Sequence, residues 1–380
     1  MTKNPTNAAL SLLPDEALDA VLDTYLEAWA ARERAVCAEG AARLPADTVR
    51  ELRSSRVLAA PIPRALGGFG ADLASTVQAV RRVARHAPST ALCMIMPLGN
   101  AANARLGDEH VPPALRPQLA RGRAFIADKA TAGEILAVAN SEPGAGGELR
   151  NTRTRAVRGA DGVVRLTGRK SFATLGPDAD YFLCSARHED GALDAFFVAR
   201  TAVGVSLSDD WNALGMRATA SVGLTLEDAP AEATFVYPGA IDAVNARHWS
   251  SLLMAAVFVG IGEGALEAAL ECAPRGSSWA RATLAECALT LDAAAGFVEA
   301  VASADVLPCG EPLLERCRRA KTFAARTAVD VSSRCMTIAG GRAYRPEHAL
   351  ARAWLDAASG PLLRPPLSQA MDGIASQLLD

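Results

Sequence analysis

Residues able to hold a flat, ring-shaped ligand stand at two places in the middle of the chain. Asn140 and Ser141 come just before a glycine-rich run at residues 143–147, and Phe172 and Thr174 follow about 30 residues later. A flat, partly apolar ring with a polar edge needs an aromatic or aliphatic wall and a few fixed hydrogen-bonding groups, which these residue types supply. The glycine-rich run by itself is typical of a surface turn between a helix and a sheet. Its combination with Phe172 and Thr174 favours a ligand site.

The composition is ordinary for a packed globular enzyme. Of the 380 residues, 50% are hydrophobic and 21% are charged, which excludes a disordered or collagenous chain. The 39 Lys and Arg residues balance 42 Asp and Glu residues, and no basic stripe with interleaved aromatics occurs, so we expect no nucleic-acid partner. No Cys-x-x-Cys pair and no histidine at metal-ligand spacing occurs, so we expect no metal site. Most of the eight cysteines are expected to be small buried residues in a reducing compartment.

The sequence gives no sign of a membrane or secreted protein. The longest apolar run, residues 252–261, ends at Glu263, well short of the roughly 20 residues that a bilayer requires. It therefore predicts a buried helix. The N-terminal stretch has only Lys3 as an early positive charge and reaches Pro14 before any sustained apolar run, which is not the pattern of a secretory signal. We expect a cytoplasmic protein without a membrane partner.

The periodicity of apolar residues changes twice and divides the chain into three parts. Residues 1–132 follow the three- and four-residue steps of helices. Residues 133–240 contain short alternating runs between Gly, Asp and Pro turns, which predict an antiparallel sandwich or barrel. Residues 241–380 are rich in Ala and Leu and predict a four-helix-type bundle with subunit contacts. The expected fold class is α+β, in the order helical, β, helical. Strands are predicted at 163–166, 181–184, 195–198, 222–226 and 234–237, and C-terminal helices at 252–272, 280–304, 313–338 and 347–358.

Two local patterns occur in the N-terminal part. Asp47 precedes a short helical run and is predicted to cap its first turn. Residues 67–70 form a Gly-Gly-Phe-Gly step. A glycine-rich step can cradle a phosphate, but here no strand precedes it and no Lys-Ser or Lys-Thr follows it. We therefore expect a loop between two helices.

The residues around positions 140 and 172 resemble the flavin-facing segments of the acyl-CoA dehydrogenase family, and the likeness extends to about Asp356. The resemblance implies an N-terminal helical domain, a middle antiparallel β domain and a C-terminal four-helix bundle. It also implies non-covalently bound FAD. By this likeness, Asn140 and Ser141 face the flavin pyrimidine ring, Phe172 packs beside the flavin, and Thr174 lies near its reactive N5.

The same resemblance implies contacts with the substrate and with a neighbouring subunit. Gly147 stands where the family usually has a serine that binds the pantetheine arm of CoA. Arg217 is either a ligand contact or a structural arginine. Gly340 and Gly341 match glycines that let the FAD pyrophosphate of a neighbouring subunit approach, and Arg275 matches an arginine that reaches the partner's FAD. We therefore expect a homodimer or homotetramer.

The catalytic base of the family is missing from both of its known positions. Family members use a carboxylate to remove the α-proton of a CoA thioester while flavin N5 accepts hydride. The expected glutamate falls on Arg364, whose guanidinium stays protonated at any working pH. The second known position falls at Ser250, with His248 two residues earlier. A histidine near the start of a helix is either a base or a structural residue.

Three functions remain compatible with these residues. The first is a flavin enzyme that uses O2 on a CoA thioester or related acyl substrate, with Arg364 stabilising developing negative charge. The second is an acyl-CoA α,β-dehydrogenase whose base lies elsewhere. The third is a non-catalytic partner subunit of a hetero-oligomer. We favour the first, because an arginine occupies the position of the base.

Overall fold

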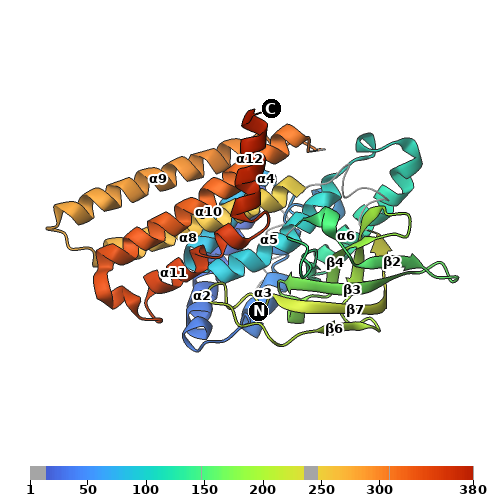
Figure 1. Ribbon diagram of the computed structural model, residues 1–380, viewed down its shortest axis with the longest axis horizontal. Helices are drawn as coiled ribbons and strands as arrows, with labels where there is room; N and C mark the ends of the chain where they lie inside the picture. The colour runs from blue at the N-terminus through green and yellow to red at the C-terminus, as the bar shows by residue number, and fades with distance from the viewer. Residues whose placement is uncertain (1–13, 147, 235–246, 308, 380) are drawn as a thin grey trace.

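A computed structural model describes residues 14–146, 148–234, 247–307 and 309–379 of the protein. Helices occupy both ends of the chain and strands the middle (Figure 1), which confirms the expected α+β order. Within the described residues, the helices before the sheet are α2 (Pro14–Ala38), α3 (Ala46–Ser54), α4 (Leu73–His86), α5 (Pro88–Ala102) and α6 (Arg116–Thr131). Those after it are α8 (Arg247–Cys272), α9 (Ser278–Ala302), α10 (Glu311–Ala339), α11 (Ala349–Ala357) and α12 (Leu367–Leu379).

The strands form one hydrogen-bonded sheet in the order β6-β7-β3-β2-β4-β5-β8, with β1 added against β4. Their bounds are β1 (Leu136–Val138), β2 (Arg155–Arg158), β3 (Val164–Ala173), β4 (Tyr181–Arg187), β5 (Leu193–Ala199), β6 (Val205–Leu207), β7 (Val222–Pro230) and β8 (Ala233–Thr234). The last predicted strand, 234–237, lies mostly outside the described residues. The short strands β1, β2 and β6 are additions to the prediction.

The sheet is antiparallel except at two places, where β4 pairs in parallel with β1 and with β2. β2 and β4 share a single residue pair, Arg155 with Arg187, so this point is a seam between two better-paired halves. The strands of the middle part therefore belong to one mixed sheet with a seam. Strands β2 and β3 lie between β1 and β4 in the sequence. This long connection allows β1 to pair in parallel with β4, whereas a tight hairpin would enforce antiparallel pairing.

The N-terminal and C-terminal helices pack directly against each other, through α4 and α8. A β-carbon on Gly260 would lie 2.5 Å from the carbonyl oxygen of Arg81, so the two helices approach as closely as they do only because this residue is glycine. Arg81 also pairs with Glu263 of α8 and with Glu299 of α9, the latter at 2.7 Å. Apolar contact and ion pairs therefore fix the bundle onto the N-terminal helices.

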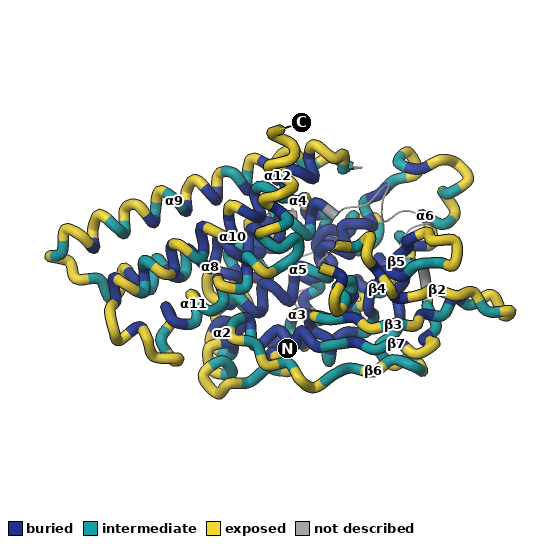
Figure 2. The backbone as a smooth tube through the Cα atoms, in the orientation of Figure 1, coloured by how far each residue is buried: buried dark blue, intermediate teal, exposed yellow. Residues whose placement is uncertain are grey.

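One hydrophobic core joins all three parts of the chain. Trp29 of α2, Phe182 of β4 and Phe258 of α8 are fully buried in it. Figure 2 shows this buried interior running through α5 and α8, while α9 exposes much of its surface. Helix α8 is the one helix in the described part whose length and apolarity would suffice to cross a membrane, but 72% of its apolar window is buried inside the protein. It is a core helix, as its sequence predicted.

Two predictions about the N-terminal part have different outcomes. The loop at residues 67–70 is present between a short 3-10 turn and α4. The cap of α3 is not Asp47, because the helix starts at Ala46 and Pro45 takes the cap position without a side-chain hydrogen bond. Asp47 lies in the first turn and pairs with Arg50 at 2.7 Å. It therefore interacts with the positive end of the helix through its charge rather than as a cap.

Candidate active site

A β-bulge near the end of β3, between Lys170 and Ala173, exposes an aromatic ring. The Ser171 N–H donates to the Ser141 carbonyl over 2.8 Å, which ties the end of β3 to the loop after β1. Phe172 has a φ of +61°, which is unusual for a bulky residue, and it is 64% exposed. Its ring packs edge-on against Trp211, with 6.4 Å between ring centroids. The bulge thus offers the kind of aromatic wall that a flat ring requires.

A chain of buried hydroxyl groups begins at Thr174. Thr174 Oγ1 lies 2.9 Å from Ser221 Oγ, which lies 2.8 Å from Thr219 Oγ1. Thr219 in turn donates to the Met216 carbonyl over 2.9 Å. Each hydroxyl has a single proton, so this last bond fixes the direction of the others: Thr174 donates to Ser221, and Ser221 donates to Thr219. Thr174 keeps only its lone pairs for any further partner.

A buried ion pair lies directly behind Ser141. Lys170 Nζ is 2.6 Å from Glu142 Oε1, and the two side chains are 0% and 4% exposed. Glu142 also accepts from the N–H groups of Arg153 and Thr154 and from the Thr154 hydroxyl. The pair therefore joins β3 to the loop that carries Ser141. Lys170 could have been found in the sequence, because the alternation along β3 puts it on the buried side, where a charge needs a partner.

Asn140 and Lys170 both form a hydrogen bond with Ser185 of the neighbouring strand β4. The Asn140 side-chain oxygen accepts from the Ser185 N–H over 2.8 Å, and the Ser185 carbonyl accepts from Lys170 over 2.6 Å. The Asn140 oxygen is thus used to hold the loop to β4. A ligand in front of this loop would meet its backbone and the Ser141 hydroxyl.

Arg364 reaches this loop from the far end of the chain. Its Nη2 donates to Ser141 Oγ over 3.0 Å across a separation of 223 residues. Its Nε is buried without a hydrogen-bond partner. Burial lowers the pKa of Arg364, while the charges of Glu148 and Glu142 oppose that shift. Even so, a guanidinium remains protonated in proteins, so the site contains a fixed positive charge.

These features fit a flavin ring, the group implied by the resemblance. Phe172 offers an exposed face, Ser141 offers a hydroxyl, and the unpartnered Nε of Arg364 is a buried donor in need of an acceptor. A reduced flavin carries negative charge on its pyrimidine side, which a nearby cation would stabilise. The structure thus brings together Ser141 and Arg364 from the predicted set, with Phe172 on the adjoining strand end.

The two alternative base positions on α8 do not join this cluster. His248 is fully buried, and its Nε2 lies 2.6 Å from Asp305 Oδ1. Ser250 faces α5, where its Oγ would lie 2.6 Å from a β-carbon placed on Gly99. In the described part of the chain, neither residue contacts Ser141 or Arg364. The His248–Asp305 contact favours a structural role for this histidine.

The guanidinium of Arg217 donates to backbone carbonyls, and no ligand site is needed to explain its position. It donates to the carbonyls of Ala213 and Gly40 over 3.0 and 2.9 Å, which favours the structural alternative for this residue. The neighbouring Met216 N–H donates to Asp356 Oδ1 over 2.5 Å. The segment around Arg217 is therefore fixed to the turn after α2 and to α11. Gly147, the other predicted substrate contact, lies outside the described residues.

The partly buried Asp356 predicts a pH-dependent stability. Burial raises the pKa of this carboxyl from 3.8 to about 7, so the folded state prefers the neutral form. The resulting stabilisation is complete below pH 3.8 and is lost as the pH rises to about 7. We expect Asp356→Asn, which keeps an acceptor oxygen without a charge, to be more stable than the wild type at pH 8 by on the order of 2 kcal/mol.

Thermal unfolding at pH 5 and pH 8 tests this expectation, with the exposed Asp330→Asn as the matched control. The gain should be largest at pH 8 and less than about half as large at pH 5, where the unfolded carboxyl is already mostly ionised, and the control should show no such gain. An equal loss of stability at both pH values would mean that the hydrogen bond to Met216 matters more than the charge.

The residues predicted to contact a neighbour's cofactor gather at the opposite end of the bundle. Gly340 and Gly341 follow α10, and a β-carbon on either would meet no atom within 4 Å. Arg342 Nη2 donates to the Cys272 carbonyl over 2.7 Å, which joins this segment to the turn that contains the exposed Arg275. In Figure 1 these turns lie at the end of the bundle away from the sheet. Within one chain they are thus remote from Ser141.

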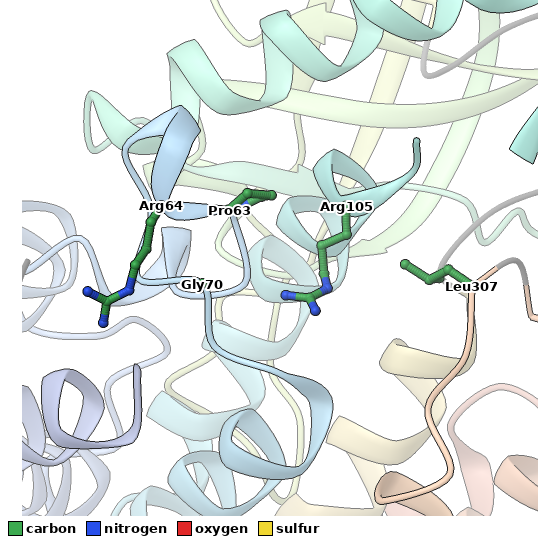
Figure 3. A pocket seen from close by; sticks show the side chains of 5 residues that line it. All are labelled: Pro63, Arg64, Gly70, Arg105 and Leu307. Carbon is green, nitrogen blue, oxygen red and sulfur yellow. The ribbon is translucent and has the colours of Figure 1, made fainter. Parts of the chain in front are cut away.

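A separate pocket of about 450 Å³ lies beside the loop at residues 67–70. Figure 3 shows Arg64 and Arg105 along it, with Leu307 on the opposite side. Arg64 donates to the Phe69 carbonyl over 3.0 Å, and the Arg105 guanidinium stands 5.7 Å from the centre of the Trp249 ring. No predicted site residue lines this pocket. The chemistry expected from the sequence therefore belongs to the cluster around Ser141 and not to the pocket.

Three family models match successive parts of the chain. The N-terminal domain of acyl-CoA dehydrogenase matches residues 15–123, the middle domain 137–229 and the C-terminal domain 252–360. The chain is 30% identical to the amino sugar nitrososynthase DnmZ of Streptomyces peucetius, over 91% of this chain and 88% of that protein. It is 26% identical to the putative acyl-CoA dehydrogenase YdbM of Bacillus subtilis, over 87% of this chain and 88% of that protein.

A solved structure has the same arrangement. KijD3, in complex with FMN and dTDP-3-amino-2,3,6-trideoxy-4-keto-3-methyl-D-glucose, superimposes with a TM-score of 0.81 at 26% identity, over 95% of this chain and 93% of that one. The matched domains thus follow one another in the family's order and share its fold. The chain belongs to the acyl-CoA dehydrogenase family and is a flavin-dependent oxidoreductase.

Proposed function

We propose that the protein is a flavin-dependent oxygenase that uses O2 to oxidise the amino group of a nucleotide-linked amino sugar. The observation that carries this proposal is Arg364, a partly buried cation bonded to Ser141 where the family's base is expected. The amino sugar is suggested by the name of the relative DnmZ and by the ligand of KijD3. A CoA thioester, the substrate expected from the sequence, takes second place because no described carboxylate or histidine is hydrogen-bonded to Arg364 or Ser141.

The lack of a base argues against α,β-dehydrogenation at this site. Removal of an α-proton requires a carboxylate or a neutral histidine within hydrogen-bond reach. Among the described residues, no such group forms a hydrogen bond with Ser141 or Arg364. Reduction of O2, by contrast, develops negative charge, and a fixed cation stabilises it. Oxygen chemistry therefore suits Arg364 better than proton abstraction does.

The proposed reaction needs electrons from outside the substrate. Oxidation of a primary amine places one oxygen atom of O2 on nitrogen and releases the other as water, using two electrons and two protons. A second round on the hydroxylamine, followed by loss of water, gives a nitroso group. A bound flavin would supply the electrons to O2, and a nicotinamide-dependent reductase is the class of partner that could renew them.

The residues of the site would divide the remaining tasks. Arg364 would stabilise negative charge and Ser141 would orient the guanidinium, since the two are hydrogen-bonded. Phe172 and Trp211 would shield one side of the ring from water. Thr174, whose proton is committed to Ser221, would accept a hydrogen bond from an N–H group.

Labelled oxygen tests the proposed function. The flavin-loaded protein is supplied with a chemical reductant, ¹⁸O2 and a dTDP-linked amino sugar, and the product is analysed by mass spectrometry. We expect amine-dependent oxygen uptake and ¹⁸O on the product nitrogen. A panel of acyl-CoA thioesters is tested in parallel without O2. Bleaching of the flavin by an acyl-CoA, with no labelled amine product, would contradict the proposal and favour a dehydrogenase.

The wall residue Phe172 should contribute to flavin binding. Phe172→Ala removes an exposed aromatic face, and the loss of such a contact costs about 1.5–3 kcal/mol, or about ten- to a hundredfold in affinity. Titration of flavin fluorescence measures the change. Val203→Ala is the matched control, because Val203 is also apolar and 87% exposed. Unchanged flavin affinity in Phe172→Ala would remove this residue from the site.

We further propose that the flavin is FAD and that its adenosine end contacts a second subunit. Gly341→Leu is then expected to weaken FAD binding about tenfold and to leave FMN binding unchanged, because FMN lacks the adenosine half. Gly373→Leu is the control, since a β-carbon at either glycine meets no atom within 4 Å of its own chain. Equal binding of FAD and FMN by the wild type and by both variants would contradict this part of the proposal.

Exposed apolar residues on the bundle support a homodimer or homotetramer. Trp279 is 55% exposed and Leu289 is 69% exposed, both on α9, and such residues gather where surfaces are covered by a partner. Light scattering on the flavin-loaded protein should give twice or four times the mass of one chain. We also propose a cytoplasmic location, which agrees with the buried cysteines Cys93, Cys184, Cys287, Cys317 and Cys335 being thiols.

A further inference from the structure

Lys321, in the middle of α10, is a buried lysine that holds a single segment of the chain. It is 2% exposed. Its Nζ donates to the carbonyls of Gly360, Leu363 and Pro365 over 3.2, 2.7 and 3.0 Å. An ammonium group has three donors and no acceptor, so this set uses its full capacity. All three acceptors lie in the segment at residues 360–366 that connects α11 to α12.

The charge of Lys321 is expensive to bury, and it has no counter-ion among the described residues. Burial accordingly lowers the pKa of Lys321 to about 8. A well-packed apolar side chain would avoid this cost. The three carbonyl contacts are the compensation that the structure offers for it.

The segment at residues 360–366 has few other means of keeping its shape. Three of its seven residues are prolines, which have no backbone N–H to donate. The N–H groups of Leu362 and Leu363 both go to the Ser359 carbonyl. A β-carbon on Gly360 would lie 2.9 Å from atoms of Ala325 and of Phe258, so the start of the segment is pressed onto α10 and α8. Lys321 then binds the stretch that follows.

That stretch carries Arg364. Residues on both sides of it, Leu363 and Pro365, present their carbonyls to Lys321, while the Arg364 side chain points to Ser141. On the opposite side of the contact, Lys170 and Glu142 hold the loop of Ser141. The two partners of the Arg364–Ser141 contact are therefore anchored separately, each by a buried lysine.

We propose that Lys321 is the positioning residue for Arg364: by binding three carbonyls of the segment at residues 360–366, it holds the guanidinium against Ser141. This inference rests on the proposed function, in which Arg364 acts on developing negative charge. Lys321 itself is 2% exposed and spends its three donors on these carbonyls, so its role is indirect. Misplacement of a group by about 1 Å can lower turnover about a hundredfold. Removal of the Lys321 side chain should therefore lower kcat.

Hydrogen exchange on the flavin-free protein gives a test that does not depend on activity. The variant Lys321→Met keeps the length of the side chain without its donors, and the control is Lys129→Met on α6. We expect amides in the peptide spanning residues 359–370 to exchange about tenfold faster in Lys321→Met and as in the wild type in the control. Wild-type exchange in Lys321→Met would overturn the proposal.

Kinetics of the loaded enzyme test whether Lys321 acts through Arg364. Lys321→Met should lower kcat about tenfold or more while the KM for the amine changes less than about twofold. In the Arg364→Ala background the same substitution should cause no further loss, because the group to be positioned is gone. Additive losses in the double variant would overturn the positioning role.

Two further results separate this inference from the proposed function. If Arg364→Ala keeps full turnover on a confirmed substrate, the role of Arg364 fails, while faster exchange in Lys321→Met still supports the tether. If Lys321→Met does not fold, Lys321→Gln, which retains two donors, replaces it in both experiments. A Lys321→Gln protein with wild-type exchange and wild-type kcat would overturn the proposal.

Discussion

Replacing Arg364 by alanine is expected to lower oxygen-dependent turnover about a hundredfold or more and to leave flavin binding nearly intact. The guanidinium is held 3.0 Å from Ser141 Oγ in a partly buried setting, where a fixed charge requires no reorganisation as negative charge develops. Removal of one such group typically costs about 3–4 kcal/mol of transition-state stabilisation. Steady-state oxygen uptake and flavin titration on the same preparation measure the two quantities.

Two further substitutions of Arg364 sharpen this expectation. Arg364→Lys keeps the charge but loses the planar fork of donors, so we expect an intermediate turnover. Arg364→Glu restores a carboxylate at the position of the family's base and is expected to abolish oxygen-dependent turnover. Should Arg364→Glu gain α,β-dehydrogenation of an acyl-CoA under nitrogen, the site retains the geometry of a dehydrogenase. Full turnover in Arg364→Ala would remove Arg364 from the mechanism.

Loss of Lys170 is expected to cause the largest change in stability. Lys170→Met leaves Glu142 as an unpaired carboxylate that is 4% exposed, and breaking a buried pair in this way costs about 3–5 kcal/mol. Urea unfolding measures the difference. Lys129→Met is the control, because Lys129 forms a more exposed pair with Glu134, and such pairs contribute about 0–1 kcal/mol.

The pH dependence of this loss identifies its cause. Burial opposes the ionisation of Glu142, but hydrogen bonds from Lys170, Thr154 and Arg153 outweigh it and lower the pKa of the carboxyl below 4.5. A lowered pKa contributes stability above pH 4.5 that is lost as the pH falls. The deficit of Lys170→Met should therefore narrow in acid, and adding Glu142→Gln should recover part of it at pH 7. No recovery in that double variant would mean that Lys170 acts through packing alone.

The sequence predicted the long helices and the well-paired strands because their signals are local. Helix α4 and strand β7 repeat their buried residues with the period of their own element, which short-range sterics and burial impose. Strand β2 was missed since its pattern contains a single buried residue, Ala156, too few to establish alternation. Asp47 was misjudged because a proline ahead of it took the cap position, and residue type alone does not fix a helix start to one position.

The candidate site likewise contains residues that could be predicted from the sequence and one that could not. Ser141, Phe172 and Thr174 stand in short motifs whose residue types state what they can bind, and counting along the chain was enough to find an arginine at position 364. Lys321 was not found, although it lies on the buried stripe of α10 beside Ala320 and Ala324. A lysine on a buried stripe signals that its charge needs acceptors. The acceptors of Lys321 are backbone carbonyls, which every residue has, so the sequence does not show which segment it binds.

The sequence by itself therefore determined the family, the helical–β–helical order, the residues suited to a flavin and the absence of a carboxylate at the expected position of the base. The tertiary structure decided that Arg364 bonds to Ser141, that Lys170 holds the loop of Ser141, and that Lys321 holds the segment of Arg364. The physical reason is the reach of the interactions. Periodicity and turn chemistry act over a few residues, whereas a hydrogen bond across 223 residues exists only once the helices and the sheet have packed.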